Sequence, residues 1–311
     1  METHRFTGEG ETTNHDDANH SSCDSERTEA EDLQARTISI PECSVSDSTV
    51  FKYCLGSSID SGLLLKDIST SLSEEVLSKF ADDVSLYSGC SHHRQQILIS
   101  KKLIEDGTNL WNTISNNSCL VHWDTAVPVI RKKFSLIARS CARSLTKEDF
   151  KLLKSIAGCQ ECMTSENFEK MWCWLYPVAV TLSKDFINKA WISLSPKCIE
   201  GFITKEEAEN SLHNMHGLQV PGTFILRFPT SRSWPHPDAG NLVVTYVGRD
   251  YTIHHKLLSL DYILSNADGE NIKPLQEILL EDPALSRLVT KPIHDNELRK
   301  KNFCKFYKQN N

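Results

Sequence analysis

The spacing of apolar residues changes near Trp191, and this change limits what the chain can fold into. Upstream, apolar side chains recur every three or four residues, which is the period of amphipathic helices. Downstream, short runs rich in β-branched and aromatic residues are separated by Gly, Pro and Asp, a pattern typical of strands joined by turns. The 311 residues therefore predict an α+β chain with more than one folding unit.

The charge of the chain is unevenly distributed. Residues 1–48 carry 12 acidic side chains and 3 arginines, a charge of −9, whereas the whole chain carries −7. This segment has too few large apolar side chains to offset the entropy lost on ordering, so we expect a disordered acidic leader. Residues 292–311 are rich in Lys and Arg, and we expect them to form a basic tail.

Hydropathy and cysteine usage indicate the compartment. The longest apolar run, Met171–Leu182, contains Pro177 and is shorter than the ~20 residues of a membrane-spanning helix. The first residues lack the apolar segment of a secretory signal, and the chain has 11 cysteines, an odd number that suits reduced thiols. We expect a cytoplasmic or nuclear protein that does not enter a membrane.

The cysteines do not predict a metal site. Cys159 and Cys162 form a CxxC pair, with Cys141 and Cys173 nearby, but neither a second such pair nor a spaced pair of histidines accompanies them. We therefore expect neither a metal nor another cofactor.

The helical region divides into two segments. In residues 49–114, Ser71-Leu-Ser-Glu74 fits a capping box before one helix, and a longer helix is predicted from about Arg94 to Ile114. The role of this segment is not visible in the sequence: it is either a docking surface or, by default, a packing element.

Residues 115–186 predict a compact all-helical module. Thr146-Lys-Glu-Asp149 begins a helix that ends at Gly158. The next helix carries aromatic residues at helical spacing, and we expect Pro177 to end it. We interpret this aromatic stripe as core.

Residues 187–291 predict a helix, an antiparallel three-stranded sheet and a second helix. Thr204-Lys-Glu-Glu207 begins a helix of about three turns that continues through Leu212. We expect the final helix to cover the other face of the sheet. The predicted strands are residues 223–228, 242–247 and 251–257, and the final helix is residues 275–280, continued by residues 284–289.

Arg227 is the unusual residue of this region, because it lies within the apolar run Phe224-Ile-Leu-Arg-Phe228. A guanidinium withdrawn from water needs a carboxylate or an anion brought by a ligand. The hydroxyls of Thr230, Ser231 and Ser233 follow in a loop, and Lys205 begins the preceding helix. These are the parts of a phosphate-binding pocket.

Two stretches, Gly201-Phe-Ile-Thr-Lys-Glu-Glu-Ala-Glu209 and Pro221-Gly-Thr-Phe-Ile-Leu-Arg-Phe228, resemble a Src homology 2 (SH2) domain, in particular that of the STAT family. Phe168-Glu-Lys-Met-Trp-Cys-Trp174 is similar to the helical linker that precedes the SH2 domain in STAT proteins. A linker and SH2 domain without the other STAT domains resembles the STAT-like SH2 proteins of plants and protists. The resemblance covers about residues 115–290.

The resemblance implies an SH2 fold, with a central antiparallel sheet between two helices, that binds phosphotyrosine. It assigns the phosphate to Arg227, Lys205 and Ser231. Pro229 departs from the family pattern and lacks an N–H, so Thr230 or Ser233 would have to replace one phosphate contact. His254 and His255 lie on the third strand, where either could border the phosphotyrosine ring.

The same resemblance raises the question of STAT-like assembly. Tyr307 follows the SH2 region about where a STAT tyrosine is phosphorylated, so a homodimer through reciprocal SH2 binding is one alternative and a plain tail tyrosine is the other. About 65 helical residues upstream of the linker cannot hold a STAT coiled coil and DNA-binding domain, so DNA binding is not carried over. The chain is either a short STAT-like protein, a shortened isoform or a fragment.

The leading hypothesis is a non-enzymatic phosphotyrosine-binding signalling adaptor whose partner is a tyrosine-phosphorylated protein or peptide. The alternative is a scaffold with a degenerate pocket, in which Arg227 contacts an Asp or Glu and is closed to solvent. An enzyme is not expected, because the sequence has no nucleophile elbow, HExxH, Walker loop or kinase signature.

Overall fold

The computed structural model describes residues 45–89, 91–140, 142–193, 198–214, 217–258 and 273–289. Most of the predicted acidic leader, the basic tail with Tyr307, and Cys141 lie outside these residues. The helices are α1 (Asp47–Leu55), α2 (Ser58–Ser71), α3 (Glu74–Ser88), α4 (His92–Ser115), α5 (Trp123–Ile137), α6 (Lys147–Ala157), α7 (Ser165–Leu182), α8 (Asp185–Ile192), α9 (Lys205–Ser211) and α11 (Leu275–Leu280). The strands are β1 (Val121–His122), β2 (Cys162–Met163), β3 (His213–Asn214), β4 (Gly217–Leu218), β5 (Thr223–Arg227), β6 (Val243–Val247), β7 (Ile253–Leu257) and β8 (Arg287–Leu288).

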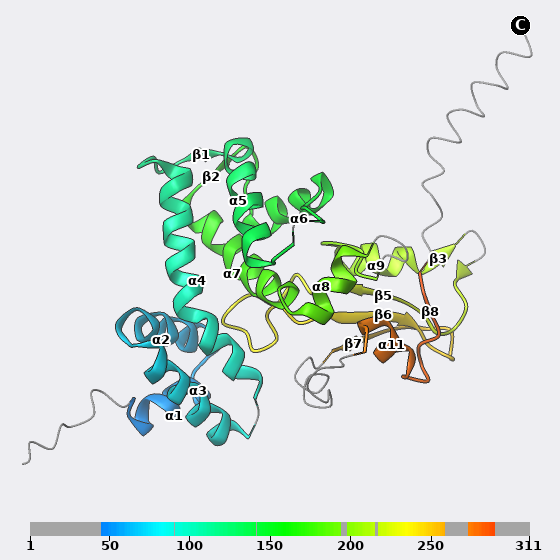
Figure 1. Cartoon of the computed structure of the whole chain (residues 1–311), viewed down its shortest axis with the longest axis horizontal. Helices are drawn as coiled ribbons and strands as arrows, with labels where there is room; N and C mark the ends of the chain where they lie inside the picture. The colour runs from blue at the N-terminus through cyan, green and yellow to red at the C-terminus, as the bar shows by residue number, and fades with distance from the viewer. Residues whose placement is uncertain are drawn as a thin grey trace, which may run out of the picture. The chain divides into compact units, whose positions relative to one another are not determined.

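Helix α4 connects the two parts of the helical region (Figure 1). It packs against α2 and α3 and also against α5 and α7. Its buried apolar side chains belong to the same apolar cluster as those of α7. The role of residues 49–114 therefore includes packing against the helices that follow, as expected by default.

Local capping rules identified two helix starts correctly. The side chain of Thr146 accepts the N–H of Asp149 at 3.2 Å, and that of Thr204 accepts the N–H of Glu207 at 3.1 Å, each in a complete capping box. The prediction for Ser71 was wrong: Ser73 caps α3, whereas Ser71 ends α2 and donates to the carbonyl of its preceding turn. The capping-box pattern favoured Ser71 because Glu74 lies three residues after it, but this pattern does not show where α2 ends.

Pro177 does not end α7, contrary to the prediction. It lies inside the helix, which continues to Leu182. Proline has no N–H, so the carbonyl of Cys173, four residues earlier, loses its intrahelical partner. The backbone N–H of Trp234 donates to that carbonyl at 2.8 Å. A contact from about sixty residues away in sequence thus satisfies the group that the proline leaves open.

The main sheet has the strand order β7-β6-β5-β8. Strands β5, β6 and β7 form the predicted antiparallel meander, with Arg227 opposite Val243 and Thr245 opposite His255. Helix α9 has seven residues, shorter than the predicted three turns, because β3 begins at His213.

Strand β8 replaces the helix predicted for residues 284–289 and pairs parallel to β5. Gly222 makes this possible: its φ is 85°, and a Cβ there would collide with Ser286. The carbonyl of Gly222 accepts the N–H of Ser286 at 2.8 Å. The free edge of β5 therefore captures a segment whose local pattern favours a helix.

The two faces of the sheet are buried differently. Phe224, Leu226 and Val244 on one face join α11 and the helical region in one large core cluster. Ile225 and Val243 on the other face are buried outside that cluster, on the side of α9. Helices α9 and α11 lie on opposite sides of the sheet (Figure 1). The mixed part thus has a central sheet between two helices.

Phe202 joins the helical region to the sheet. Its ring lies 4.9 Å from that of Trp174, 5.9 Å from that of Trp191 and 6.2 Å from that of Phe228, measured between centroids. These rings come from α7, α8 and the residue that follows β5. The core is therefore continuous between the two parts of the fold.

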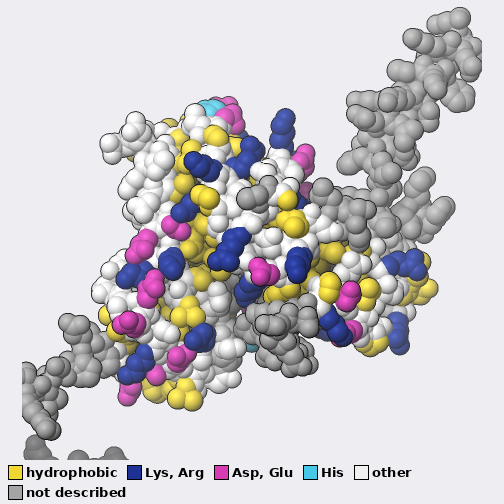
Figure 2. Space-filling view, in the orientation of Figure 1, with side chains coloured by type: hydrophobic (Ala, Val, Ile, Leu, Met, Phe, Trp, Pro, Cys, Tyr) yellow, Lys and Arg dark blue, Asp and Glu magenta, His cyan; other side chains and the backbone are white. Residues whose placement is uncertain are grey.

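The surface shows no strong segregation of charge on the face in Figure 2, where basic, acidic and apolar side chains are interspersed over the helices. None of the described helices has the length and hydrophobicity needed to cross a bilayer.

Candidate anion-binding site at Arg227

Arg227 is the last residue of β5 and is 5% exposed. Its Nε donates to Oγ1 of Thr245 on β6 at 3.2 Å. Thr245 is completely buried, and the pleat of the paired strands places both side chains on the face that α9 covers. The sheet therefore fixes the guanidinium through one of its nitrogens.

A chain of polar contacts continues from Thr245 to α9. Nδ1 of His255 lies 3.0 Å from Oγ1 of Thr245, and Nε2 of His255 lies 3.0 Å from Oε1 of Glu209. Nζ of Lys205 lies 3.6 Å from the same carboxylate oxygen. All contacts are satisfied when Thr245 donates to Nδ1 of His255 and the Nε2–H of the imidazole donates to Glu209. This arrangement uses a neutral His255.

The electrostatics of the site agree with that assignment. Burial is the main cause that lowers the pKa of His255; Arg227 and Lys205 lower it further, while Glu209 raises it. Burial also lowers the pKa of Arg227, against the opposing effect of Glu206 and Glu209.

Arg227 meets one of the two conditions expected of a degenerate pocket. It is closed to solvent to a large degree, but no carboxylate oxygen of a described residue lies within 4.0 Å of the guanidinium. Its terminal nitrogens make no hydrogen bond within the part of the chain that the structure describes. Two parallel N–H groups remain for an anion.

The two neighbouring histidines separate onto opposite faces. His255 lies on the face of Arg227, whereas His254 is on the other face and stacks on Tyr246 with ring centroids 5.3 Å apart. Nε2 of His254 also lies 3.0 Å from Oδ1 of Asp250. The assignment of His254 to the site was wrong, because consecutive strand residues point to opposite faces.

The loop hydroxyls lie toward the helices. Ser231 and Ser233 line a hollow of about 400 Å³ together with Lys66 of α2 and Glu169 of α7. Neither these two serines nor Thr230 hydrogen-bond to Arg227. The side chain of Lys205, by contrast, is about half exposed on the face of Arg227. The structure thus brings Lys205 and His255 into the polar network of Arg227 but not the three hydroxyls.

Pro229 is buried, and its carbonyl accepts the indole N–H of Trp174 at 3.0 Å. Pro229, which departs from the family pattern, therefore contacts α7 through its carbonyl.

Two members of the site were not identified from the sequence, Thr245 and Glu209. Strand register was the available signal for Thr245, because pairing the two predicted strands brings it beside Arg227. Glu209 is four residues after Lys205, so helical spacing places the two on one face of α9.

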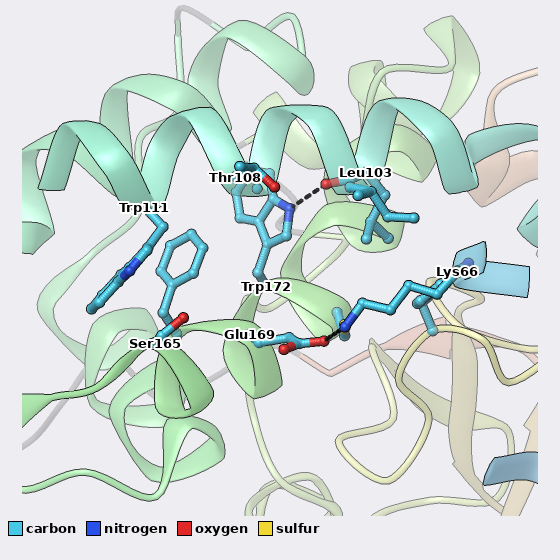
Figure 3. A pocket seen from close by; sticks show the side chains of 12 residues that line it. Lys66, Leu103, Thr108, Trp111, Ser165, Glu169 and Trp172 are labelled. Carbon is cyan, nitrogen blue, oxygen red and sulfur yellow. Dashed lines mark hydrogen bonds and ion pairs between the residues drawn. The ribbon is translucent and has the colours of Figure 1, made fainter. Parts of the chain in front are cut away.

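A separate pocket of about 200 Å³ lies between α4 and α7 (Figure 3). The rings of Trp111, Phe168 and Trp172 form its walls, and Lys66 and Glu169 form an ion pair beside it. The indole N–H of Trp172 donates to the carbonyl of Leu103 at 2.9 Å. Among the described residues, no His, Cys, Asp or Glu group is arranged to hold a metal.

The fold and the buried strand arginine define an α+β module compatible with an SH2 domain. The chain is 57% identical over 277 residues to SH2 domain-containing protein A of Arabidopsis thaliana. The aligned residues are 88% of this chain and 42% of that protein. It is also 57% identical over 245 residues to SH2 domain-containing protein B of the same plant, covering 78% of this chain and 36% of that protein. The chain is thus a homologue of plant SH2 domain-containing proteins, which confirms the resemblance to the plant SH2 proteins.

The other comparisons add little. No known family model matches the chain. Among solved structures, an inactive choanoflagellate E3 ubiquitin ligase Cbl TKB overlaps 75% of this chain and 80% of its own chain at 15% identity, with a TM-score of 0.26. A likeness this low supports no conclusion. The chain spans less than half the length of the two plant relatives, and those matches do not test the STAT-type linker. They support a signalling or interaction protein built on an SH2 domain.

Proposed function

We propose that the chain binds tyrosine-phosphorylated proteins or peptides through Arg227. The observation that supports this most directly is a buried strand arginine held by Thr245, with no carboxylate partner among the described residues. Its terminal N–H groups suit a bidentate contact with phosphate. Lys205 and His255 border the same face, and the loop that carries Thr230, Ser231 and Ser233 begins two residues after Arg227.

The affinity of such a site rests on the phosphate. A hydrogen bond to a charged group contributes about 1.5–3 kcal/mol, so losing a fork of two reduces affinity by about 10²- to 10⁴-fold. Arg227→Ala should therefore abolish measurable binding. Arg227→Lys should restore little, because an ammonium cannot form the fork.

The test is calorimetric titration of the full chain with a degenerate phosphotyrosine peptide pool, its unphosphorylated twin and its phosphoserine twin. The matched control is Arg94→Ala, an exposed arginine paired with Asp82. We expect heat with phosphotyrosine alone, lost in Arg227→Ala and retained in Arg94→Ala. Equal heat from phosphorylated and unphosphorylated pools would contradict the proposal.

A scaffold is the second candidate function. It is favoured by the 5% exposure of Arg227 and by the use of Pro229 as a contact with Trp174. A folded protein that gives no phosphate-dependent heat would support this candidate.

Three further expectations are part of the proposal. The chain acts without enzymatic activity, in the cytoplasm or the nucleus. A homodimer through reciprocal binding would require phosphorylation of Tyr307, which lies outside the described residues. Sedimentation before and after tyrosine phosphorylation tests that assembly, with Tyr307→Phe as the control.

A further inference from the structure

The loop that follows Arg227, residues 229–240, is attached to two helices of the helical region. The indole N–H of Trp234 donates to the carbonyl of Gln96 on α4 at 3.0 Å. The side-chain amide of Gln96 returns a hydrogen bond to the carbonyl of Ala239 at 3.0 Å. Both Trp234 and Gln96 are buried, so these contacts are not weakened by exchange with water.

Helix α7 attaches the loop at two further points. The indole of Trp174 holds the carbonyl of Pro229 at 3.0 Å, and the carbonyl of Cys173, left open by Pro177, accepts the N–H of Trp234 at 2.8 Å. Gly240 packs on Pro177 so closely that a Cβ would collide with the proline carbonyl. The start, middle and end of the loop therefore all contact one helix.

The strand that carries Arg227 is also held along the edge that does not pair with β6. Ile199 forms a parallel bridge with Leu226, the residue before Arg227. Arg143 donates to the carbonyls of Ile199 and Glu200 at 2.7 and 2.9 Å, and Oδ1 of Asp149 accepts the N–H of Phe202 at 2.8 Å. Arg143, in the connection between α5 and α6, and Asp149 of α6 thus fix the backbone beside β5.

We propose that the helical region is part of the phosphotyrosine-binding unit, because it positions the loop after Arg227, and that Trp174 is a positioning residue for phosphate binding. This inference rests on the proposed function. Trp174 acts through Pro229, two residues from Arg227, and it does not touch the phosphate. Pro177 has a matching role, since it leaves the Cys173 carbonyl free for the loop.

The same helix offers a matched control. Trp172 and Trp174 are both buried on α7, and each indole donates to a backbone carbonyl, at 2.9 and 3.0 Å. Trp172 bonds to Leu103 of α4, whereas Trp174 bonds to Pro229 of the loop. Trp172→Phe and Trp174→Phe thus remove the same group and similar ring area, but only the second releases the loop.

The experiment measures phosphotyrosine-peptide affinity by calorimetry and amide hydrogen exchange in the full chain. One net hydrogen bond corresponds to about a two- to tenfold change in affinity. We expect that loss in Trp174→Phe, with faster exchange of residues 230–240, and less than a twofold change in Trp172→Phe. Pro177→Ala, which restores a competing N–H, should also weaken binding, whereas Pro128→Ala in α5 should not.

The outcomes separate this inference from the proposed function. Wild-type binding with equal affinities in Trp174→Phe and Trp172→Phe overturns the inference and leaves the function intact. A wild-type chain that shows no phosphate-dependent binding overturns the function and the inference together. If Trp174→Phe does not fold, the Pro177→Ala and Pro128→Ala pair decides: equal affinities overturn the inference, and weaker binding in Pro177→Ala alone supports it.

Discussion

The guanidinium of Arg227 is held by Thr245, whose hydroxyl accepts the Nε–H at 3.2 Å from the neighbouring strand. The same hydroxyl lies 3.0 Å from Nδ1 of His255. One buried oxygen therefore connects the arginine of β5 to the histidine of β7. The orientation of the guanidinium depends on this contact, because no other described residue hydrogen-bonds to it.

Thr245→Val tests that dependence. Valine keeps the shape of threonine but removes the acceptor, leaving a buried Nε–H of Arg227 without its partner. We expect the free energy of unfolding to fall by about 1–3 kcal/mol and phosphotyrosine affinity to fall with it. Urea unfolding and calorimetry provide the two measurements.

Thr223→Val is the matched control for that change. Thr223 is also completely buried, at the other end of β5, and donates to the carbonyl of Val220 at 2.7 Å. The Thr223→Val variant should have a lower free energy of unfolding but the same phosphotyrosine affinity as the wild type. Unchanged affinity in Thr245→Val would show that Thr245 does not orient Arg227.

Arg143→Lys should destabilise the junction between the helical region and the sheet. Nη1 of Arg143 donates to the carbonyls of Trp191 and Ile199, both at 2.7 Å, and its guanidinium lies 3.6 Å over the Trp191 ring. A lysine ammonium cannot stack in this way or span the same acceptors. We expect a loss of about 2–4 kcal/mol in the free energy of unfolding, measured in urea.

Arg94→Lys controls for the change of residue type, because Arg94 is exposed and pairs with Asp82 at the surface. Its effect should stay within about 0.5 kcal/mol. Equal effects at the two positions would argue against a special role for Arg143.

The pKa of His255 predicts a dependence of stability on pH. Burial lowers this pKa below its ordinary value of 6.5, so the folded state favours the neutral imidazole. The resulting stabilisation is complete above pH 6.5 and is lost as the pH falls through the lower folded-state pKa. Burial also lowers the pKa values of His93 and His236, so these two histidines contribute to the same loss of stability at low pH.

We therefore expect the urea midpoint to decrease between pH 7 and pH 5, and His255→Gln to reduce that decrease. His254→Gln is the control, because His254 lies on the opposite face beside Asp250. A decrease that is identical in wild type and His255→Gln would refute the prediction.

The sequence predicted those features that depend on neighbours along the chain. The capping boxes at Thr146 and Thr204 and the three strands around Arg227 follow from local rules, and the structure has them. Pro177 was misjudged for a physical reason: the group it leaves unpaired is satisfied by Trp234, and no local pattern encodes that contact.

The site was predictable to a similar degree. The apolar neighbours of Arg227 singled it out, but its partner Thr245 depends on strand pairing, and the separation of His254 from His255 depends on register. The segment of β8 has a helical pattern, yet it pairs with β5 because Gly222 lets it approach. Tertiary contacts decided each of these cases.

Gly107→Ala should destabilise the chain, although alanine favours helices by about 1 kcal/mol over glycine. Gly107 lies inside α4, and a Cβ there would be 2.7 Å from Cδ1 and Nε1 of Trp172 on α7. The indole would have to move and would lose its hydrogen bond to Leu103 (Figure 3). Overpacking of this kind costs about 1–3 kcal/mol, so the net change should be unfavourable.

A double-mutant cycle isolates the cause. In a Trp172→Phe background the smaller ring leaves room for the methyl group, and Gly107→Ala should become neutral or stabilising. If urea unfolding shows the same cost in both backgrounds, the collision with Trp172 is not its source.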